Sequence, residues 1–395
     1  MDNTTTYRTF SGTLSHEINN DTNSEIQPHF PPELPGHPSA SDLRLLQTVT
    51  MVLHRCYAPT LIVLGSLGNL LIIFAIRSTK LAKVPIMHFI FGIAVSDTLF
   101  LFSLVLEWCG RMSFRLTTQT GWCQSVYFIS NMAMFMTLWF HVALIVERYI
   151  NMCNETIQTS TFKCHIPNIA CSTLRAKTCV LCVFVIGLVV YVNMCLTVDY
   201  ALLQGPIAIC LPQYHLFSAL PYLDKVDIIV NVLIPYSIMA ILLVRIAIEL
   251  ISRCKGREKA MDMGVMERRH WLAIHKQEVM LTASVLGLCG VYLILNTPSQ
   301  ILRAFYMTQT PKPTPVSELI LQLILHAAYW TTFALNLPIL LLTFKPFRRA
   351  IYFLFWSLHK KLRSCRNKDR TPLATVHFGV MFSTTLVTLN ETSLM

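Results

Sequence analysis

Residues 122–149 read WCQSVYFISNMAMFMTLWFHVALIVERY, and the rest of the chain is arranged around them. Cys123 and Arg148 are 25 positions apart, so a continuous helix separates them by about 37 Å, slightly more than the hydrocarbon core of a bilayer. Four small polar residues interrupt the apolar run: Ser130, Asn131, Thr137 and His141. A helix that faced lipid on all sides would not carry them, so the pattern predicts a membrane-spanning helix buried among other helices.

The composition indicates a membrane protein throughout. Of the 395 residues, 53% are hydrophobic and only 13% are charged, against about 25% charged in an average soluble domain, and the mean hydropathy is +0.51. The net charge of +11 does not indicate a nucleic-acid partner, because the bases gather in alternate loops and after the last apolar stretch. Most of the 13 cysteines lie inside apolar stretches, where cysteine acts as a small hydrophobe.

Seven apolar stretches each have the length of a membrane span. They cover residues 56–77, 85–109, 121–150, 176–198, 225–250, 276–306 and 318–343. Bases crowd the loops at 77–83 and 249–276 and the segment after Phe344, which predicts that these parts are cytoplasmic and that the amino terminus is extracellular. The expected fold is an all-α membrane protein with a disordered extracellular tail (1–54), a seven-transmembrane-helix bundle (55–344), a short amphipathic helix on the membrane surface (345–365) and a cytoplasmic tail (366–395).

This topology predicts three modification sites in a protein of the plasma membrane. Asn3 and Asn20 each begin an Asn-x-Thr tripeptide, which is a glycosylation acceptor in an extracellular tail. In the amphipathic helix, bases alternate with aromatic residues that suit the headgroup level. Cys365 at its end is therefore a palmitoylation candidate.

Several short motifs occur at mutually consistent distances. They are Gly68-Asn69, Ile93-Ala94-Val95-Ser96-Asp97, Cys123, Glu147-Arg148-Tyr149, Pro235, Asn296-Thr297-Pro298 and Asn336-Leu337-Pro338. In this set the chain resembles the rhodopsin-like family of G-protein-coupled receptors, over residues 56 to about 360. The resemblance implies a receptor that transmits the binding of an extracellular ligand to a heterotrimeric G protein, with arrestin and membrane lipid as further partners.

The chain also departs from the family pattern. The fourth span has no Trp, Leu295 and Asn296 replace a Cys and an aromatic residue in the sixth, and Leu243 stands where the fifth usually has a Tyr. The seventh span has Leu337 before its proline, and Leu341 where a Tyr is usual. These changes thin the polar network with which the family holds its active state.

At the cytoplasmic end, the resemblance implies a switch built on Arg148 and its neighbours Glu147 and Tyr149. Glu278 lies 20 residues before Pro298, which is about 30 Å back along the sixth helix. Both acids can reach the level of Arg148, so we expect a resting lock that outward movement of the sixth helix breaks. The alternative is a juxtamembrane arginine that extends to lipid phosphates.

At mid-membrane, Asp97 lies twelve residues after Pro85, which starts its helix. An ionisable group at this depth is by default functional, and Asn69, Thr137 and Asn336 are expected to surround it. The resemblance implies that a sodium ion can bind there; a neutral, protonated Asp97 that joins helices is the alternative. No other metal and no cofactor is expected.

On the extracellular side, the resemblance implies a disulfide between Cys123 and Cys210, which would hold the loop after the fourth span over the bundle mouth. A second bridge between Cys56 and Cys109 is an open alternative.

Helical periodicity places Tyr127, Ser130 and Asn131 on one face of the third span, and polar residues at the outer ends of the other spans complete the predicted ligand pocket. The candidates are Glu107, Gln124, Tyr127, Ser130, Asn131, Asp227, Asn296, Gln300 and Arg303. Amine receptors of the family have an Asp where this chain has Ser130, so a small biogenic amine is disfavoured.

The acidic, aromatic-lined mouth instead suits a ligand with a cationic group, such as a short amidated peptide that contains Arg. The segment NTPSQILR (296–303) is similar to that of invertebrate FMRFamide-type neuropeptide receptors. Glu107 and Asp227 are the expected cation partners; as solvated rim charges they would contribute little.

Other functional classes lack their sequence signals. A transporter would show internal repeats or paired broken helices, and a membrane enzyme would show a nucleophile with its base or a metal set, so neither transport nor catalysis is expected. The remaining alternative is a seven-helix membrane protein that binds a ligand or partner receptor without activating a G protein, because Leu337 and Leu341 remove polar groups from the switch.

Overall fold

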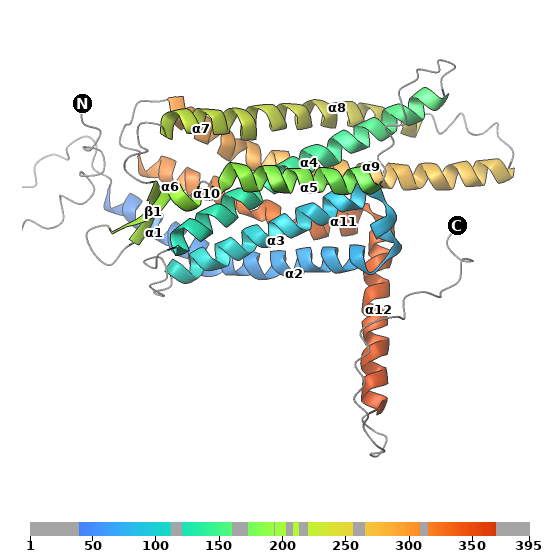
Figure 1. Ribbon diagram of the computed structural model, residues 1–395, viewed down its shortest axis with the longest axis horizontal. Helices are drawn as coiled ribbons and strands as arrows, with labels where there is room; N and C mark the ends of the chain where they lie inside the picture. The colour runs from blue at the N-terminus through green and yellow to red at the C-terminus, as the bar shows by residue number, and fades with distance from the viewer. Residues whose placement is uncertain are drawn as a thin grey trace, which may run out of the picture. The chain divides into compact units, whose positions relative to one another are not determined.

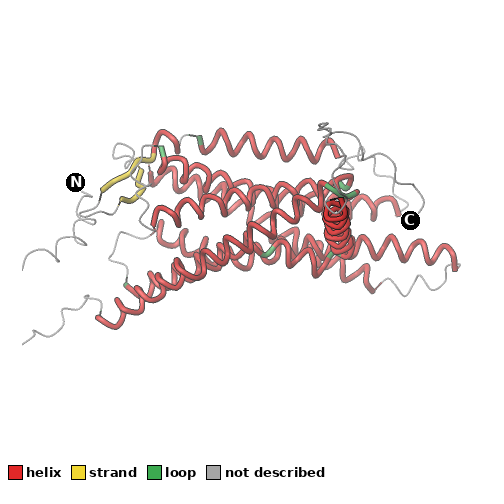
Figure 2. Tube along the Cα trace, turned by 90° about the horizontal axis from the view of Figure 1, so that it is seen from below, coloured by secondary structure: helices red, strands yellow, loops and turns green. Residues whose placement is uncertain are grey.

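The computed structural model describes residues 39–111, 121–159, 173–192, 194–202, 208–212, 220–255, 265–308 and 315–368 (Figure 1). The elements in chain order are α1 (Ala40–Val52), η1 (Leu53–Tyr57), α2 (Ala58–Arg77), η2 (Lys80–Lys83), α3 (Pro85–Arg111), α4 (Trp122–Thr159), α5 (Thr173–Tyr191), α6 (Met194–Thr197), β1 (Val198–Leu202), β2 (Ala208–Pro212), α7 (Leu220–Ile228), η5 (Ile229–Leu233), α8 (Ile234–Lys255), α9 (Val265–Thr308), α10 (Val316–Thr331), η7 (Thr332–Ala334), α11 (Asn336–Thr343) and α12 (Lys345–Lys368). The long helices of residues up to 351 run alongside one another as a bundle (Figure 2).

Seven helical segments of the described residues are suited to cross a bilayer by length and hydropathy. Six are Ala40–Arg77, Pro85–Gly110, Trp122–Cys153, Thr173–Tyr191, Lys225–Ser252 and Lys276–Tyr306. The seventh consists of Val316–Ala334 and Asn336–Thr343, which meet at an angle of 53°. This break lies just before Pro338, whose missing N–H group and ring disfavour a straight helix there. The predicted seven-span bundle is confirmed.

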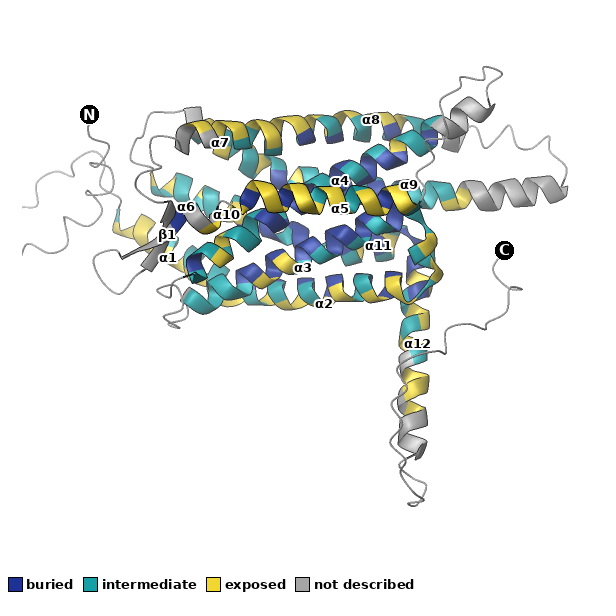
Figure 3. Cartoon of the chain, in the orientation of Figure 1, coloured by how far each residue is buried: buried dark blue, intermediate teal, exposed yellow. Residues whose placement is uncertain are grey.

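The helix α4 is the centre of the bundle, as its polar interruptions predict. It packs against α3, α5, α8 and α9, and Leu144 and Ile145 are completely buried. Most of α5 is exposed, with apolar side chains such as Leu181 and Val189 on its surface (Figure 3). This contrast is typical of a membrane bundle, in which outer helices present apolar side chains to lipid.

Small residues allow the helices to approach closely. A Cβ atom added at Gly65 on α2 would lie 2.7 Å from Cδ1 of Leu101 on α3 and 3.1 Å from Cβ of Ala334 in η7. The absence of a side chain at this position therefore lets three elements pack at one point.

Two spans contain π-helical turns, which shift the phase of the residues that follow. The turn η1 precedes Pro59 in α2, and η5 precedes Pro235 in α8. Proline cannot donate the regular helical hydrogen bond, so both irregularities lie where the ladder is already interrupted.

The structure adds three elements that the sequence pattern did not predict. Residues 40–53, assigned above to the tail, are helical, and Oγ of Ser39 caps α1 by accepting a hydrogen bond from the Asp42 backbone N–H at 3.1 Å. The strands β1 and β2 form an antiparallel pair in which Tyr200 is opposite Cys210.

The chain divides into two compact units, Met1–Ile351 and Tyr352–Met395. The helix α12 covers the predicted amphipathic segment, with Tyr352, Phe355 and Trp356 exposed. The predicted glycosylation sites Asn3 and Asn20 and the side chain of Cys365 lie outside the described part of the chain.

Candidate functional site

Arg148 is held by the sixth span at one end of the bundle. Its Nη1 atom donates to Oε2 of Glu278 at 2.6 Å, Nη2 donates to the Glu278 carbonyl oxygen at 3.2 Å, and Nε donates to Oγ1 of Thr282 at 2.8 Å. The Arg148 side chain is only 3% exposed and that of Glu278 is 31% exposed. The guanidinium thus joins α4 to α9 through three hydrogen bonds, whereas an arginine that extended to lipid phosphates would be exposed.

Glu147 takes a different partner from the one expected. Its Oε1 atom accepts a hydrogen bond from Nδ2 of Asn151 at 2.9 Å, one turn along α4, and the ion pair that the structure gives Arg148 is with Glu278. Adjacent residues on a helix point in different directions, so Glu147 and Arg148 face different neighbours. Tyr149 points in a third direction and is 37% exposed.

Three of the four residues predicted for the mid-membrane cluster, Asp97, Thr137 and Asn336, meet there from three spans. Oδ1 of Asp97 accepts from Oγ1 of Thr137 at 2.6 Å, and Oδ2 accepts from Nδ2 of Asn336 at 2.5 Å. Ser96 adds a hydroxyl contact to Thr137 at 2.8 Å. Asn69 lies outside this network, because its Nδ2 donates to the Phe333 carbonyl at 2.8 Å and so ties α2 to η7.

The sodium ion implied for this cluster stays a prediction. Oxygen atoms of Asp97, Thr137 and Ser96 gather here, and Asn336 points an N–H group toward Asp97. Among the described residues, no group of three or more His, Cys, Asp or Glu side chains is placed to hold a metal. The hydrogen bonds of Asp97 connect α3 to α4 and α11.

A layer of aromatic and amide groups adjoins this cluster. The His141 ring stacks on Tyr292 with centroids 4.4 Å apart, and its Nδ1 atom lies 2.7 Å from the Thr137 carbonyl. Nδ2 of Asn296 donates to the Tyr292 carbonyl at 2.7 Å and to Oγ1 of Thr332 at 3.2 Å. This layer connects α4, α9 and η7.

A cavity of about 60 Å³ opens above that layer. Four predicted site residues line it: Asn131, Asp227, Gln300 and Arg303. The cavity also includes residues that the sequence analysis missed, among them Tyr191, Asn231, Tyr236 and Tyr329. Asn231 is one helical turn from Asp227, so periodicity could have found it, whereas the tyrosines carry no signal that separates them from other apolar residues of the spans.

Asp227 is already paired inside the chain. Its Oδ2 atom lies 2.7 Å from Nη2 of Arg303, and its Oδ1 atom accepts from Nδ2 of Asn231 at 2.6 Å and from the Tyr191 hydroxyl at 3.4 Å. The same Asn231 amide donates to the Tyr191 hydroxyl at 2.9 Å. The carboxylate thus joins α7 to α5, η5 and α9.

The other predicted pocket residues do not line this cavity. Asn296 is completely buried but is not part of the lining, and Glu107 on α3 lies close enough to Tyr127 on α4 to interact electrostatically. Gln124 and Ser130 also lie outside its lining. The periodicity identified the correct face of α4 only near Asn131.

Two cysteine predictions have different outcomes. Cys123 is buried and disulfide-bonded. Its expected partner Cys210 lies on β2, but the side chain of Cys210 is outside the described part of the structure, so this pairing stays a prediction. Cys56 and Cys109 are both free, so the alternative bridge between them does not form.

The bundle, its central α4 and the buried arginine define a multi-pass membrane receptor of the seven-span class. Residues 68–337 match the family model described as 7 transmembrane receptor (rhodopsin family). This match covers more than half of the chain, and the protein belongs to that family. No curated protein sequence matches the chain.

Proposed function

We propose that this receptor binds a short extracellular peptide at the Asp227 end of the bundle and activates a heterotrimeric G protein at the Arg148 end. The observation that carries the proposal is the set of three hydrogen bonds from Arg148 on α4 to Glu278 and Thr282 on α9. An ion pair between a buried arginine on one helix and an acid on the next is a two-state element, because moving one helix breaks it and opens a cavity between them. Arrestin is proposed to use the same cavity.

The orientation in the plasma membrane follows from charge. Bases crowd the segments that adjoin the Arg148 end, so this end is cytoplasmic and the amino-terminal tail is extracellular. In this orientation Asn3 and Asn20 are available for glycosylation, Cys123 and Cys210 face an oxidising compartment, and Cys365 is near the inner leaflet.

The cavity of about 60 Å³ near Asp227 favours a ligand that donates hydrogen bonds. In the described part of the chain, Oδ1 of Asn231 and Oε1 of Gln300 are buried acceptors with no donor. Buried polar atoms without partners are costly, so N–H groups of a ligand would be stabilised there. A peptide amide or a guanidinium group supplies such donors.

A cationic ligand group would compete with Arg303 for Asp227. The Arg303 side chain is 41% exposed and that of Asp227 is 28% exposed, so the internal pair is accessible at the mouth of the cavity. A guanidinium from the ligand that replaced Arg303 would release α9 from α7. Glu107, near Tyr127 on the other side of the bundle, is the second proposed cation partner.

The test is a library of short amidated neuropeptides applied to membranes that contain the receptor, with nucleotide exchange on an added heterotrimeric G protein as the readout. We expect an Arg-containing amidated peptide to stimulate exchange, and Asp227→Asn to reduce its potency tenfold or more, since a charge-assisted contact contributes about 1.5–3 kcal/mol. Asp42→Asn, which removes an exposed carboxylate on α1, is the matched control.

Two results would contradict the proposal. Unchanged potency in Asp227→Asn would remove that residue from the binding site. A peptide that bound the receptor without stimulating exchange on any heterotrimeric G protein would favour the alternative, a seven-helix protein that binds ligand without G-protein activation.

A further inference from the structure

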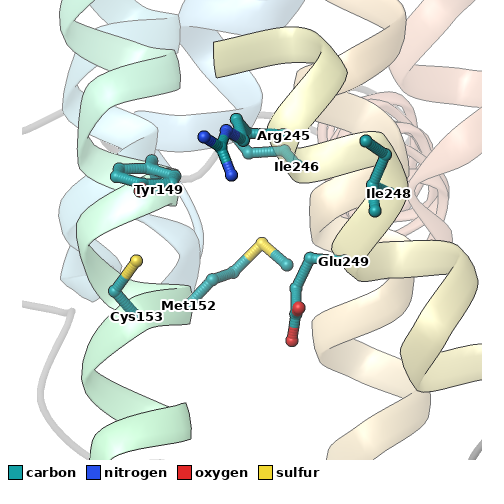
Figure 4. A pocket seen from close by; sticks show the side chains of 7 residues that line it. All are labelled: Tyr149, Met152, Cys153, Arg245, Ile246, Ile248 and Glu249. Atoms are coloured by element: carbon teal, nitrogen blue, oxygen red, sulfur yellow. The ribbon is translucent and has the colours of Figure 1, made fainter. Parts of the chain in front are cut away.

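A second cavity, of about 340 Å³, lies between α4 and α8 at the Arg148 end (Figure 4). Its lining comprises Tyr149, Met152 and Cys153 from α4 and Arg245, Ile246, Ile248 and Glu249 from α8. The volume falls at the lower end of the range of ligand pockets, about 300–1,000 Å³. It is separate from the contact between Arg148 and Glu278, neither of which lines it.

Arg245 gives this cavity its charge. In Figure 4 the Arg245 side chain points from α8 toward Tyr149 on α4, and the two groups interact electrostatically. No carboxylate of the described residues forms an ion pair with Arg245. Glu249, the acid in the lining, lies one turn further along α8 and has an interaction of its own. The cavity therefore presents a cation that is available to an anion.

The surface next to the cavity is apolar and exposed. Ile241, Val244 and Ile248 on α8 are 62%, 55% and 60% exposed, in the part of that helix suited to cross the bilayer. A ligand held by Arg245 therefore has a polar end within the cavity and an apolar surface beside it. This pairing of one cationic group with lipid-facing aliphatic side chains matches an amphiphile that carries a negative charge.

The depth of the cavity matches a headgroup. Tyr149 directly follows Arg148, so in the orientation proposed above the cavity lies at the inner leaflet, where anionic phospholipids are concentrated. Long basic side chains at that level reach toward phosphates.

We propose that this cavity binds the headgroup of an anionic glycerophospholipid, with Arg245 as the partner of the negative group and the α8 surface as the support of an acyl chain. The cavity is present in the arrangement in which Arg148 is bound to Glu278, so the lipid binds the receptor in that resting arrangement.

Cys153 provides a direct test, because it is a free cysteine in the cavity lining. The receptor is placed in bilayers of phosphatidylcholine alone or with phosphatidylserine, and alkylation by N-ethylmaleimide is followed at each cysteine by mass spectrometry. We expect phosphatidylserine to slow alkylation of Cys153 about fivefold, the factor that one basic residue near an anionic surface supplies. Cys56, exposed and free at the opposite end, is the internal control.

Two variants assign the effect to the cavity. Arg245→Gln is expected to abolish the protection and Arg245→Lys to retain part of it, while Arg349→Gln, which removes an exposed base outside the cavity, leaves it intact. The proposal is overturned if Cys153 reacts equally fast in both bilayers, or if protection survives in Arg245→Gln. It is also overturned if inorganic phosphate protects Cys153 equally well in phosphatidylcholine alone, which would show a site for soluble phosphate. None of these measurements requires a G protein or a peptide, so they do not depend on those parts of the proposed function.

Discussion

At the scale of single residues, the depth of Arg148 determines what its partners contribute. In Glu278→Ala the buried guanidinium would keep only the Thr282 hydroxyl and a backbone carbonyl. A hydrogen bond to a charged group contributes about 1.5–3 kcal/mol, so we expect the resting arrangement to lose that amount and basal nucleotide exchange to rise tenfold or more. The measurement is G-protein nucleotide exchange without ligand, at matched surface expression.

The control for this variant is Asp42→Ala, which removes an exposed carboxylate at the other end of the bundle. Glu278→Asp should give an intermediate basal activity, since the acid is kept but its reach is shortened. Basal exchange that stayed at the wild-type level in Glu278→Ala would show that the ion pair does not hold the resting state.

The Asp97 cluster allows a second prediction at this scale. Asn336→Leu removes the donor to Oδ2 of Asp97 and leaves a buried acceptor without a partner. The loss of such a donor costs about 1–3 kcal/mol, so the midpoint of thermal unfolding in detergent should fall by several degrees. Thr98→Val is the control, because that hydroxyl bonds only to the Ala94 carbonyl of its own helix. Equal midpoints for the two variants would contradict a stabilising role for the cluster.

At the scale of elements, the packing of α2 against α3 and η7 depends on Gly65. In Gly65→Ala the new methyl group meets Leu101, which is completely buried, and Ala334, which packs against the core, and such overpacking typically costs about 1–3 kcal/mol. We expect a lower unfolding midpoint and less receptor at the cell surface. In the matched variant Gly290→Ala the nearest atom is at an ordinary 3.7 Å, so stability should be kept or rise. A Gly65→Ala receptor as stable as Gly290→Ala would contradict the close approach.

The spans and the lock could be predicted from the sequence because each depends on distance along one helix. The apolar run sets the span length, and the 20-residue offset from Pro298 places Glu278 at the level of Arg148. The pairing of Asp227 with Arg303 could not be predicted in this way, because it depends on how α7 and α9 are rotated about their own axes. The π-helical turn η5 also changes the helical phase of the residues that follow Asp227. The sequence analysis did not predict the start of α1, because its first residues, Ala40 to Asp42, are small or polar and resemble the tail before them.

At the scale of the whole molecule, α9 is tied to the rest of the bundle by an ion pair at each end. Glu278 binds Arg148 on α4, and Arg303 binds Asp227 on α7. These two α9 residues are 25 positions apart, about 37 Å along the helix, and Pro298 lies between them. Movement of α9 about this proline would therefore change both contacts, which is how binding at one end can be read at the other.

This arrangement predicts that breaking only the ion pair between Arg303 and Asp227 activates the receptor weakly. Exposed ion pairs contribute about 0.2–1 kcal/mol, so Arg303→Ala should raise basal nucleotide exchange by up to about fivefold, less than Glu278→Ala does. Since both changes act on one equilibrium at well-separated sites, their free energies should add, and basal exchange in the double variant should rise by the product of the single effects until activity saturates.

Arg303→Lys, which keeps the charge, should stay near the wild-type level. If Arg303→Ala left basal exchange unchanged while Glu278→Ala raised it, the Asp227 end would be uncoupled from the resting state, and ligand binding would have to reach α9 through the layer of His141, Tyr292 and Asn296 instead.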